Sequence, residues 1–310
     1  MTGIGSRIAH SSAARRCCLA AALIALAIAA VAFPGEQPLG AQGAPLRIIA
    51  FGAHPDDCDI RAGGTAAKWA ALGHEVRFVS VTNGNSGHQT EKRDALAARR
   101  KAEAREAGRR IGVEYIVLDN PDGELLPTLE VREQIIRQMR EWKADVVLGP
   151  RPNDYHPDHR YTGVLVQDAA YMVTVPHVTP DVPALRKNPV FMYFQDGFQK
   201  PAPFEPHVAV AIDDVFDKKI DMLDAHVSQF YEWLPWHAGV LDKVPADPAA
   251  RKRWLASQRE GRISPNVRAA LVKWYGKQRA EAVKQAEAFE VCEYGSRPSE
   301  EDLRRLFPFF

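Results

Sequence analysis

Short apolar runs alternate with longer segments of helical periodicity from residue 46 onward. The apolar runs predict strands at 46–52, 76–82, 114–118, 145–149, 190–195 and 207–213. The segments between them predict helices at 63–72, 91–111, 129–143 and 160–172. This alternation is typical of βαβ units, so we expect an α/β fold, a Rossmann-like, mainly parallel sheet sandwiched by helices.

The last third of the chain has a different pattern. Apolar residues at helical spacing over 215–230 predict a helix that covers the sheet. Beyond it, segments 251–259 and 265–289 also favour helix, and four tryptophans lie among charged residues, Trp233, Trp236, Trp254 and Trp274. We therefore expect one domain over 46–230 and a helical C-terminal extension over 231–310, packed on the same domain, that can cap the functional edge of the sheet.

The first 45 residues have the pattern of a targeting segment. Arg15 and Arg16 precede an apolar run over 17–32, which a Gly-, Gln- and Pro-containing linker follows. The small-x-small pattern predicts cleavage after Ala32, with Ala41 as a second candidate. We expect a signal peptide and linker over 1–45 and an exported protein, periplasmic or secreted, without stable membrane insertion after cleavage. An uncleaved anchor is the alternative, because the run approaches the roughly 17-residue lower limit for a membrane span.

Composition narrows the range of partners. The chain of 310 residues has 40 Lys+Arg against 39 Asp+Glu, and no basic cluster is interleaved with aromatic residues, so we expect no nucleic-acid partner. Of the four cysteines, Cys58 and Cys292 remain once the signal segment is removed, which argues against a disulfide scaffold and a Cys-rich metal site. The oligomeric state is unknown from the sequence.

Two clusters of histidine and aspartate follow predicted strands. Residues 53–57, Ala-His-Pro-Asp-Asp, come directly after the strand at 46–52, and residues 156–159, His-Pro-Asp-His, come shortly after the strand at 145–149. In an open parallel sheet, the loops at the carboxyl ends of the strands share one edge, where ligands gather. We therefore expect the two clusters to meet at this edge and to form a metal site.

A hydrolytic zinc site has three protein ligands and leaves its fourth position to water. The candidates here are His54, Asp57 and one of the pair His156 and His159. Zinc lowers the pKa of its water to about 7, and a carboxylate that is not a ligand can then take the proton. Adjacent side chains in an extended loop point in different directions, so Asp56 and Asp57 divide these tasks: one binds the metal and the other acts as the base.

A histidine braced by a carboxylate can stabilise the oxyanion of a tetrahedral intermediate and protonate the leaving amine. His156 is the candidate for this role, with Asp158 as the residue that orients it. Asn153 and Tyr155 lie on the same loop, where each can either supply a further oxyanion donor or brace the loop.

Both clusters resemble motifs of the zinc-dependent N-deacetylases called the PIG-L or LmbE-like family, which act on N-acetylglucosaminyl compounds and related amides. Members carry Ala-His-Pro-Asp-Asp after the first strand and His-Pro-Asp-His after the fourth, as this chain does at 53–57 and 156–159. The resemblance implies three metal ligands, His54, Asp57 and His159. It also implies roles for three further residues: Asp56 as general base, His156 as electrostatic or acid catalyst, and Asp158 as the partner of His156.

Further segments are similar to this family. Residues 82–84 resemble its Thr-x-Gly strand end, Arg100 with Glu103 its helix signature, and residues 119–123 its loop after the third strand. The resemblance therefore covers about 46–230, which we expect to be the deacetylase catalytic domain, whereas the chain after 230 resembles a longer branch of the family.

Several residues keep two interpretations. Arg100 is either a substrate anchor or a solvated helix residue, and Asp122 either binds a substrate hydroxyl or forms a turn. Cys58 stands where many members have Glu, and it is either an extra soft ligand or packed beneath the loop. The substrate-binding candidates are Arg100, Asp122, Asn153 and Tyr155. Four other histidines are expected on the surface or in the packing: His88, His207, His226 and His237.

The expected function is removal of the acetyl group from an N-acetylated amino sugar of the N-acetylglucosamine type by a zinc-dependent hydrolase. Zn²⁺ is the expected cofactor, with Fe²⁺ or Co²⁺ as alternatives, because a site of two histidines and one aspartate accepts all three. One alternative is an amidase for a larger acylated sugar conjugate or natural product. Another is a metal-dependent glycan-binding protein without turnover, which would need neither Asp56 as a base nor His156 as a catalyst.

Overall fold

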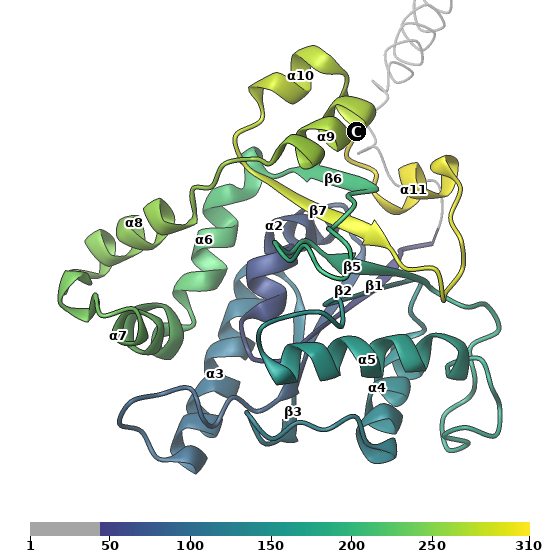
Figure 1. The fold of residues 1–310 in the computed structure, drawn as a ribbon, viewed down its shortest axis with the longest axis horizontal. Helices are drawn as coiled ribbons and strands as arrows, with labels where there is room; N and C mark the ends of the chain where they lie inside the picture. Colours follow the sequence, from purple (N-terminus) through teal and green to yellow (C-terminus); the bar gives the residue numbers. More distant parts are fainter. Residues whose placement is uncertain (1–43) are drawn as a thin grey trace, which may run out of the picture. The chain divides into compact units, whose positions relative to one another are not determined.

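The computed structural model describes residues 44–310, which form a seven-stranded sheet with helices on both faces (Figure 1). The strands are β1 (Arg47–Gly52), β2 (Glu75–Thr82), β3 (Glu114–Asn120), β4 (Val146–Gly149), β5 (Val190–Phe194), β6 (Val208–Ala211) and β7 (Ala286–Val291). Six of these confirm the predicted strands. The predicted signal peptide lies outside the described residues. Among those that are described, no helix is long and apolar enough to cross a membrane.

The strand order is β3-β2-β1-β4-β5-β7-β6. The first five strands pair in parallel, and β7 runs antiparallel to both of its neighbours, β5 and β6. The mainly parallel, Rossmann-like sheet that the alternating pattern predicts is therefore confirmed. In such a sheet the carboxyl ends of β1 and β4 are neighbours, and the order of connection reverses between them.

Helices cover the sheet on both sides. The longer ones are α2 (Asp57–Ala71), α3 (Arg93–Ile111), α4 (Leu129–Trp142), α5 (Pro157–Met172), α6 (Phe216–Asp224), α8 (Pro248–Arg259) and α9 (Pro265–Tyr275). The shorter ones are α7 (Leu234–His237), α10 (Lys277–Ala282) and α11 (Glu300–Leu306), with a π-helical segment over Ser228–Trp233. Buried residues of α2, α3 and α6 form the core on one face, and those of α4 and α5 form it on the other.

The helix predicted from residue 63 begins six positions earlier, at Asp57, so its start was placed too late. Asp57 and Asp59 lie in its first turn, where carboxylates interact favourably with the helix dipole. Gly64 lies inside the helix because the backbone passes close to Ile212, whose side chain would be 2.9 Å from an added Cβ. Close packing therefore explains this glycine.

The prediction of helix over 265–289 is wrong in its last part. The helices end at Ala282, and Ala286–Val291 forms β7 between two other strands of the sheet. Ala and Glu favour helix locally, but pairing on both sides and burial of Phe289 favour the strand. The C-terminal extension is thus not entirely helical, since it contributes a strand to the sheet.

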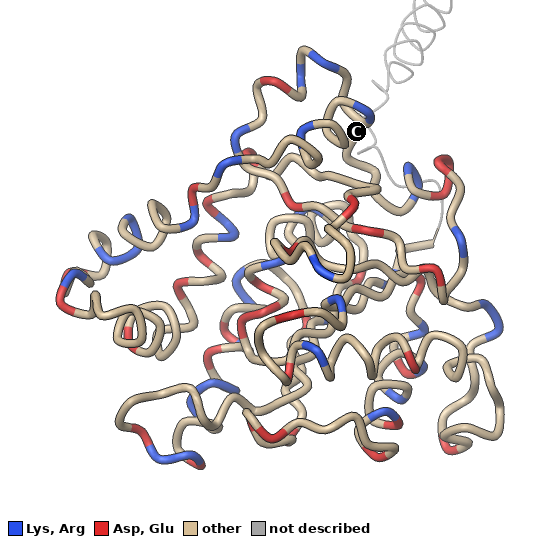
Figure 2. Tube along the Cα trace, in the orientation of Figure 1, with Lys and Arg blue, Asp and Glu red and all other residues tan. Residues whose placement is uncertain are grey.

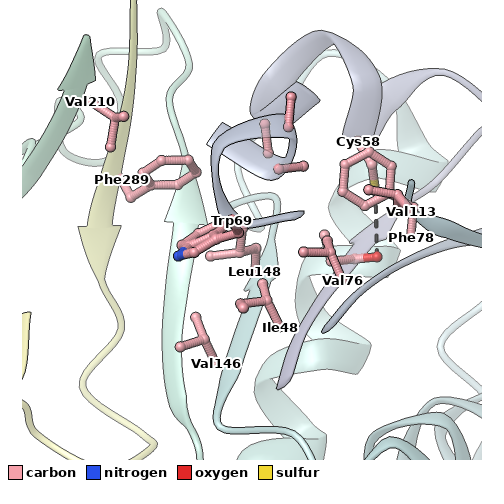
Figure 3. Packing of buried hydrophobic residues seen from close by; sticks show 14 of the residues in the cluster. Ile48, Cys58, Trp69, Val76, Phe78, Val113, Val146, Leu148, Val210 and Phe289 are labelled. Carbon is pink, nitrogen blue, oxygen red and sulfur yellow. Dashed lines mark hydrogen bonds between the residues drawn. The ribbon is translucent and has the colours of Figure 1, made fainter. Parts of the chain in front are cut away.

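Figure 3 shows part of the core between α2 and the sheet, with Trp69 lying over Val146 and Leu148 and next to Phe289. The indole N–H of Trp69 donates to the carbonyl of Leu306, 2.8 Å away, so this large side chain is buried without an unsatisfied donor. Cys58 lies in the same core. Its thiol donates to the carbonyl of Ala50, and burial raises its pKa, which confirms that it packs beneath the loop.

Candidate active site

The two histidine and aspartate clusters meet at the carboxyl ends of β1 and β4. These strands are parallel neighbours, and each cluster lies in the loop that leaves its strand. The ring centroid of His54 lies 4.7 Å from that of His156 and 5.1 Å from that of His159. The meeting expected from the sequence is confirmed.

Both clusters lie at helix N-termini, which fixes their side chains. His156 is the N-cap of α5, and Pro157 is its first residue, a position that suits proline because it lacks an N–H. Asp57 is the first residue of α2. An added Cβ on Gly52 would lie 2.6 Å from the Cβ of Asp57, so a glycine is needed where the helix starts this close to the strand.

Three side chains converge on one point between the clusters. His54 Nδ1 lies 3.2 Å from His159 Nε2, and the Asp57 carboxylate oxygens lie 3.6 Å from the former and 3.5 Å from the latter. Donor atoms about 2.1 Å from a tetrahedrally bound zinc ion would be roughly 3.4 Å apart. Each pair among the three residues that resemblance to the family selects therefore approaches this separation, with Asp57 facing His54 through Oδ2 and His159 through Oδ1.

The opposite ring nitrogens of these histidines are held by carboxylates. His159 Nδ1 lies 2.9 Å from Asp154, and His54 Nε2 lies 3.2 Å from Asp122 and 3.3 Å from Asp158. Such partners fix the ring orientation of metal-binding histidines and make them better ligands. Asp154 was not predicted, although its place in the second loop, next to Tyr155 and His156, was a usable signal.

Two further groups of donor atoms share His54. One joins it to His156 and His159, and the other joins it to Asp122 and Asp158, with all donor atoms of a group within 4.8 Å of one another. The second group uses the Nε2 side of His54, where two carboxylates already occupy the ring. The histidine and carboxylate donors around His54 thus fit a divalent cation. Because the groups differ in their other residues, substitutions of those residues can show which group holds the ion.

The protonation of the histidines shows how strongly this site favours positive charge. Burial alone would lower the pKa of His54, but hydrogen bonds to Asp122, Asp158 and Asp57 raise it well above the usual value. Burial opposes protonation of His159 as well, and Asp57 with Asp154 again raises its pKa. The excess of carboxylates over cations is the electrostatic condition that favours metal binding.

Asp56 is not one of the donors that face His54 and His159, although it is next to Asp57 in the chain. Its carboxylate is buried, and the loss of solvation raises its pKa to about 6, against the opposing effect of Arg100, 3.7 Å away. In contrast, the pKa of Asp57 is strongly lowered, because the cationic His159 and His54 outweigh its burial. The two adjacent aspartates therefore have different protonation behaviour.

His156 differs from the other two histidines. Its Nδ1 accepts a hydrogen bond from the backbone N–H of Asp158 at 3.2 Å, and burial, with the neighbouring His54 and His159, lowers its pKa. The expected pairing of the Asp158 carboxylate with the His156 ring is wrong. That carboxylate accepts from Gly123 N at 2.7 Å and lies against His54 instead.

The residues predicted to bind substrate have different surroundings. Arg100 is not solvated: it is 2% exposed and donates to the carbonyls of Gly84 and Pro55. Tyr155 is exposed, whereas Asn153 donates to Lys200 O and thereby braces its loop. Asp122 lies 3.6 Å from Arg100 as well as next to His54, so it is part of the buried charge network.

A cleft of about 410 Å³ opens over these groups. Its lining includes eight predicted site residues: His54, Asp56 and Asp57 of the first cluster, Tyr155, His156 and His159 of the second loop, Arg100 of α3, and Asp122. The C-terminal extension supplies Trp233, Leu234 and His237 to its wall. The extension therefore borders the functional edge, as expected, and His237, exposed as predicted, lies in the lining of the cleft.

Comparison with known proteins agrees with the motifs. A family model described as PIG-L, GlcNAc-PI de-N-acetylase, matches residues 49–170, which contain both clusters. A diacetylchitobiose deacetylase of Thermococcus kodakarensis is 31% identical over 209 residues, covering 61% of this chain and 73% of that protein. The chain belongs to the PIG-L family.

Solved structures of other proteins share this architecture. The N,N′-diacetylchitobiose deacetylase of Pyrococcus horikoshii has a TM-score of 0.59 and 25% identity, with 79% of this chain and 83% of that chain covered. GalB, the 4-carboxy-2-hydroxymuconate hydratase of Pseudomonas putida, has a TM-score of 0.62 at 19% identity, covering 82% of this chain and 98% of that chain, a likeness of fold alone. Since deacetylases and a hydratase share this fold, activity has to be argued from the site residues.

Proposed function

We propose that this protein is a metal-dependent N-deacetylase that removes the acetyl group from an N-acetylated amino sugar of the N-acetylglucosamine type. One observation carries the proposal: the buried carboxylate of Asp56 lies beside the donor atoms of His54, Asp57 and His159, which face one another. A relative that is 31% identical is a diacetylchitobiose deacetylase, which supports the substrate class.

In this proposal His54, Asp57 and His159 hold the metal, and zinc is the expected ion, with Fe²⁺ or Co²⁺ as alternatives. Zinc, when bound, supplies a Lewis acid that polarises the acetyl carbonyl and lowers the pKa of water. The separations of 3.2–3.6 Å between the donor atoms are compatible with this set, and the resemblance of both motifs to the family selects it over the group on the other side of His54. Asp154, Asp122 and Asp158 orient the two histidine ligands.

Asp56 is the general base. Its raised pKa, about 6, is close to the range in which a carboxylate can both accept and return a proton near neutral pH. It accepts the proton of the water that attacks the acetyl carbonyl and then passes that proton to the leaving amine, so one residue acts as base and acid. Arg100 positions it from 3.7 Å and holds the loop through the Pro55 carbonyl.

His156 stabilises the oxyanion. Because its Nδ1 accepts from the Asp158 backbone, the neutral ring carries its proton on Nε2, and the lowered pKa keeps the ring neutral. Nε2–H is then available as a donor in the cleft that the residue lines. Protonation of the amine by His156 would first require a second proton on the ring and loss of its N-cap hydrogen bond.

A deacetylation assay tests the proposal with N-acetylglucosamine and N,N′-diacetylchitobiose as substrates and free amine or acetate as the readout. Chelator treatment should abolish activity, and added zinc should restore it. Asp56→Asn should retain metal and lose activity by about 10²–10⁴-fold, the usual contribution of a positioned base. Asp242→Asn, an exposed residue of the extension, is the matched control.

Two results would count against the assignment. If the folded, metal-loaded protein released acetate from neither sugar, the substrate class would be wrong. If Asp56→Asn lost the metal, the roles of Asp56 and Asp57 would have to be exchanged.

We also propose that the protein is exported, on the basis of the basic and apolar pattern of residues 15–32. The mature chain should begin after Ala32 or Ala41. N-terminal sequencing of protein purified from its native host tests this, and an intact Met1 on a protein from the cytosolic fraction would contradict it.

A further inference from the structure

A second pocket, called here the basic pocket, lies among α6, the end of α8 and the segment that leads into β7. Its volume is about 260 Å³, and no described residue lines both this pocket and the cleft. Of its fifteen lining residues four are basic, and one, Glu260, is acidic; Figure 2 shows such positions along the chain, with Lys and Arg in blue. The basic residues are Lys219, Arg259, Arg262 and Lys284.

Three of the four cations of the basic pocket lack a counter-charge. Lys219 is neutralised by Glu287, whose carboxylate lies 2.6 Å from its Nζ. In the part of the chain that the structure describes, no carboxylate lies within ion-pair distance of Arg259, Arg262 or Lys284. The basic pocket therefore has an excess of positive charge even after Glu260 is counted, and this excess favours an anionic ligand.

Arg259 is half-buried, whereas Arg262 and Lys284 are exposed. Its guanidinium lies over the ring of Phe230, 4.6 Å from the centroid, and its buried Nε has no hydrogen-bond partner among the described residues. Burial lowers the pKa of Arg259, and Asp56 only partly opposes this effect. The last turn of a helix favours a cation such as Arg259, but Arg262 and Lys284 lie outside α8, so the helix dipole does not explain the cluster.

The rest of the lining of the basic pocket is mainly apolar. Its larger apolar side chains come from α2, α6, α9 and two loops, namely Ile60, Phe216, Leu223, Val267, Ile212 and Ile263. Ile60, Phe216 and Ile263 are only partly buried. Sites for small molecules combine such a lining with a few polar groups, and their volumes begin at roughly 300 Å³. The basic pocket therefore has the composition of a ligand site and the size for a small ligand.

We propose that the basic pocket binds a small organic anion, whose carboxylate or phosphate group pairs with Arg259 and whose apolar part packs against Ile60 and Phe216. A guanidinium presents parallel N–H donors that fit two oxygens of such a group, and the exposed Arg262 and Lys284 add attraction at the rim. An uncharged ligand would leave the cations unpaired, and an inorganic anion would leave the apolar lining in water. The site is separate from the cleft, so the inference does not depend on the proposed deacetylase function.

Titration calorimetry with four probes tests the ligand class. Octanoate and octyl phosphate carry both an oxyanion and an apolar chain, inorganic phosphate carries only the oxyanion, and octanol carries only the chain. At least one of the first two should bind at a single site, about tenfold or more tightly than inorganic phosphate or octanol, because only it engages both the cations and the apolar lining. Absence of saturable binding by both amphiphilic anions, or equal affinity for octanol, would overturn the proposal.

Variants then locate the site. Arg259→Gln should weaken binding of the tighter amphiphilic anion about tenfold, because charge-assisted hydrogen bonds are lost. Arg253→Gln is the matched control, since Arg253 lies on the same helix, is exposed and does not line the basic pocket; it should change the affinity by less than about twofold. Lys284→Gln changes an exposed rim residue, so it should fold normally and weaken binding about threefold.

Two outcomes of the variant series would reject the basic pocket as the site. One is an unchanged affinity in both Arg259→Gln and Lys284→Gln, which would place the bound anion elsewhere on the protein. The other is an equal loss in Arg253→Gln, which would show a general attraction of anions to this surface. If Arg259→Gln did not fold, Lys284→Gln beside Arg253→Gln would still decide between these results.

Discussion

The sharpest mechanistic test is to distinguish His156 as an oxyanion donor from His156 as an acid. The variants are His156→Ala, which removes the ring, and His156→Gln, whose amide N–H2 can take the place of Nε2–H. Nδ1 of His156 accepts a hydrogen bond from the Asp158 N–H at 3.2 Å, so the ring can serve as a donor through Nε2–H without changing its protonation. We therefore expect the reaction to need a hydrogen-bond donor at Nε2 and not a group that titrates. The glutamine variant should therefore retain part of the activity.

The expected magnitudes follow from the two hydrogen bonds of the ring. Loss of one oxyanion donor costs about 10²–10³-fold in kcat, which is the expected effect of His156→Ala. Loss of an N-cap acceptor costs about 1 kcal/mol of folding stability, which corresponds to a fall in Tm of roughly 2–4 °C for a domain of this size. Both variants should bind zinc normally, because neither changes His54, Asp57 or His159.

The assay is kcat and KM for N,N′-diacetylchitobiose across pH, with thermal denaturation and zinc content measured on the same preparations. His177→Ala, an exposed histidine in the loop after α5, is the control. Recovery of activity by at least about tenfold in His156→Gln over His156→Ala would support the donor role. If the two variants were equally inactive and both lost the alkaline limb of the pH profile, His156 would be the acid and the present reasoning would be refuted.

Three other predictions concern the metal and the buried charges. Asp57→Ala should abolish stoichiometric zinc binding in elemental analysis, whereas Asp122→Ala should retain it. The reverse outcome would show that the metal binds on the Nε2 side of His54. Glu287→Ala should destabilise the protein by about 3–5 kcal/mol in urea, because it leaves the buried Lys219, 2.6 Å away, without its partner; a loss below about 1 kcal/mol would contradict this. Burial lowers the pKa of His226, but the buried carboxylate of Asp59 outweighs this effect and raises it. Protonated His226 therefore stabilises the fold fully below about pH 6.5, and this stabilisation is lost as pH rises through the raised pKa. Urea denaturation from pH 6 to pH 9 should show this loss in wild type and not in His226→Asn.

The sequence predicted the parts of the fold that depend on local pattern. Period-two and continuous apolar runs gave six strands within a few residues, and the motifs at two strand ends were expected to meet because parallel strands share one carboxyl edge. β7 was missed because Ala286–Val291 has the composition of a helix. Its Glu287 is buried only because Lys219, Thr65 and the Gly64 N–H surround it, and these partners come from distant parts of the chain.

The candidate site was predictable in its residues but not in its pairings. His54, Asp56, Asp57, His156 and His159 all line the cleft, as their positions in the two motifs suggested. Sequence proximity suggested that the Asp158 carboxylate would orient His156. In the structure that carboxylate reaches across to the first loop, because residues two positions apart on a helix do not face each other. Orientation within a motif therefore depends on backbone geometry that the order of residues does not show.

The position of β7 also determines when this protein can complete its fold during synthesis. β5 and β6 are separated in the sheet by a strand that begins at Ala286, so until this strand has been synthesised β5 is paired with β4 alone and β6 has no neighbour in the sheet. Until then β5 has an open edge, and unpaired edges of this kind promote association with other chains. A fragment ending at residue 230 should therefore aggregate, even though it contains every residue of the two motifs. Insertion of β7 between β5 and β6 therefore completes the sheet, so folding constrains the sequence of this strand even though it lies outside both motifs.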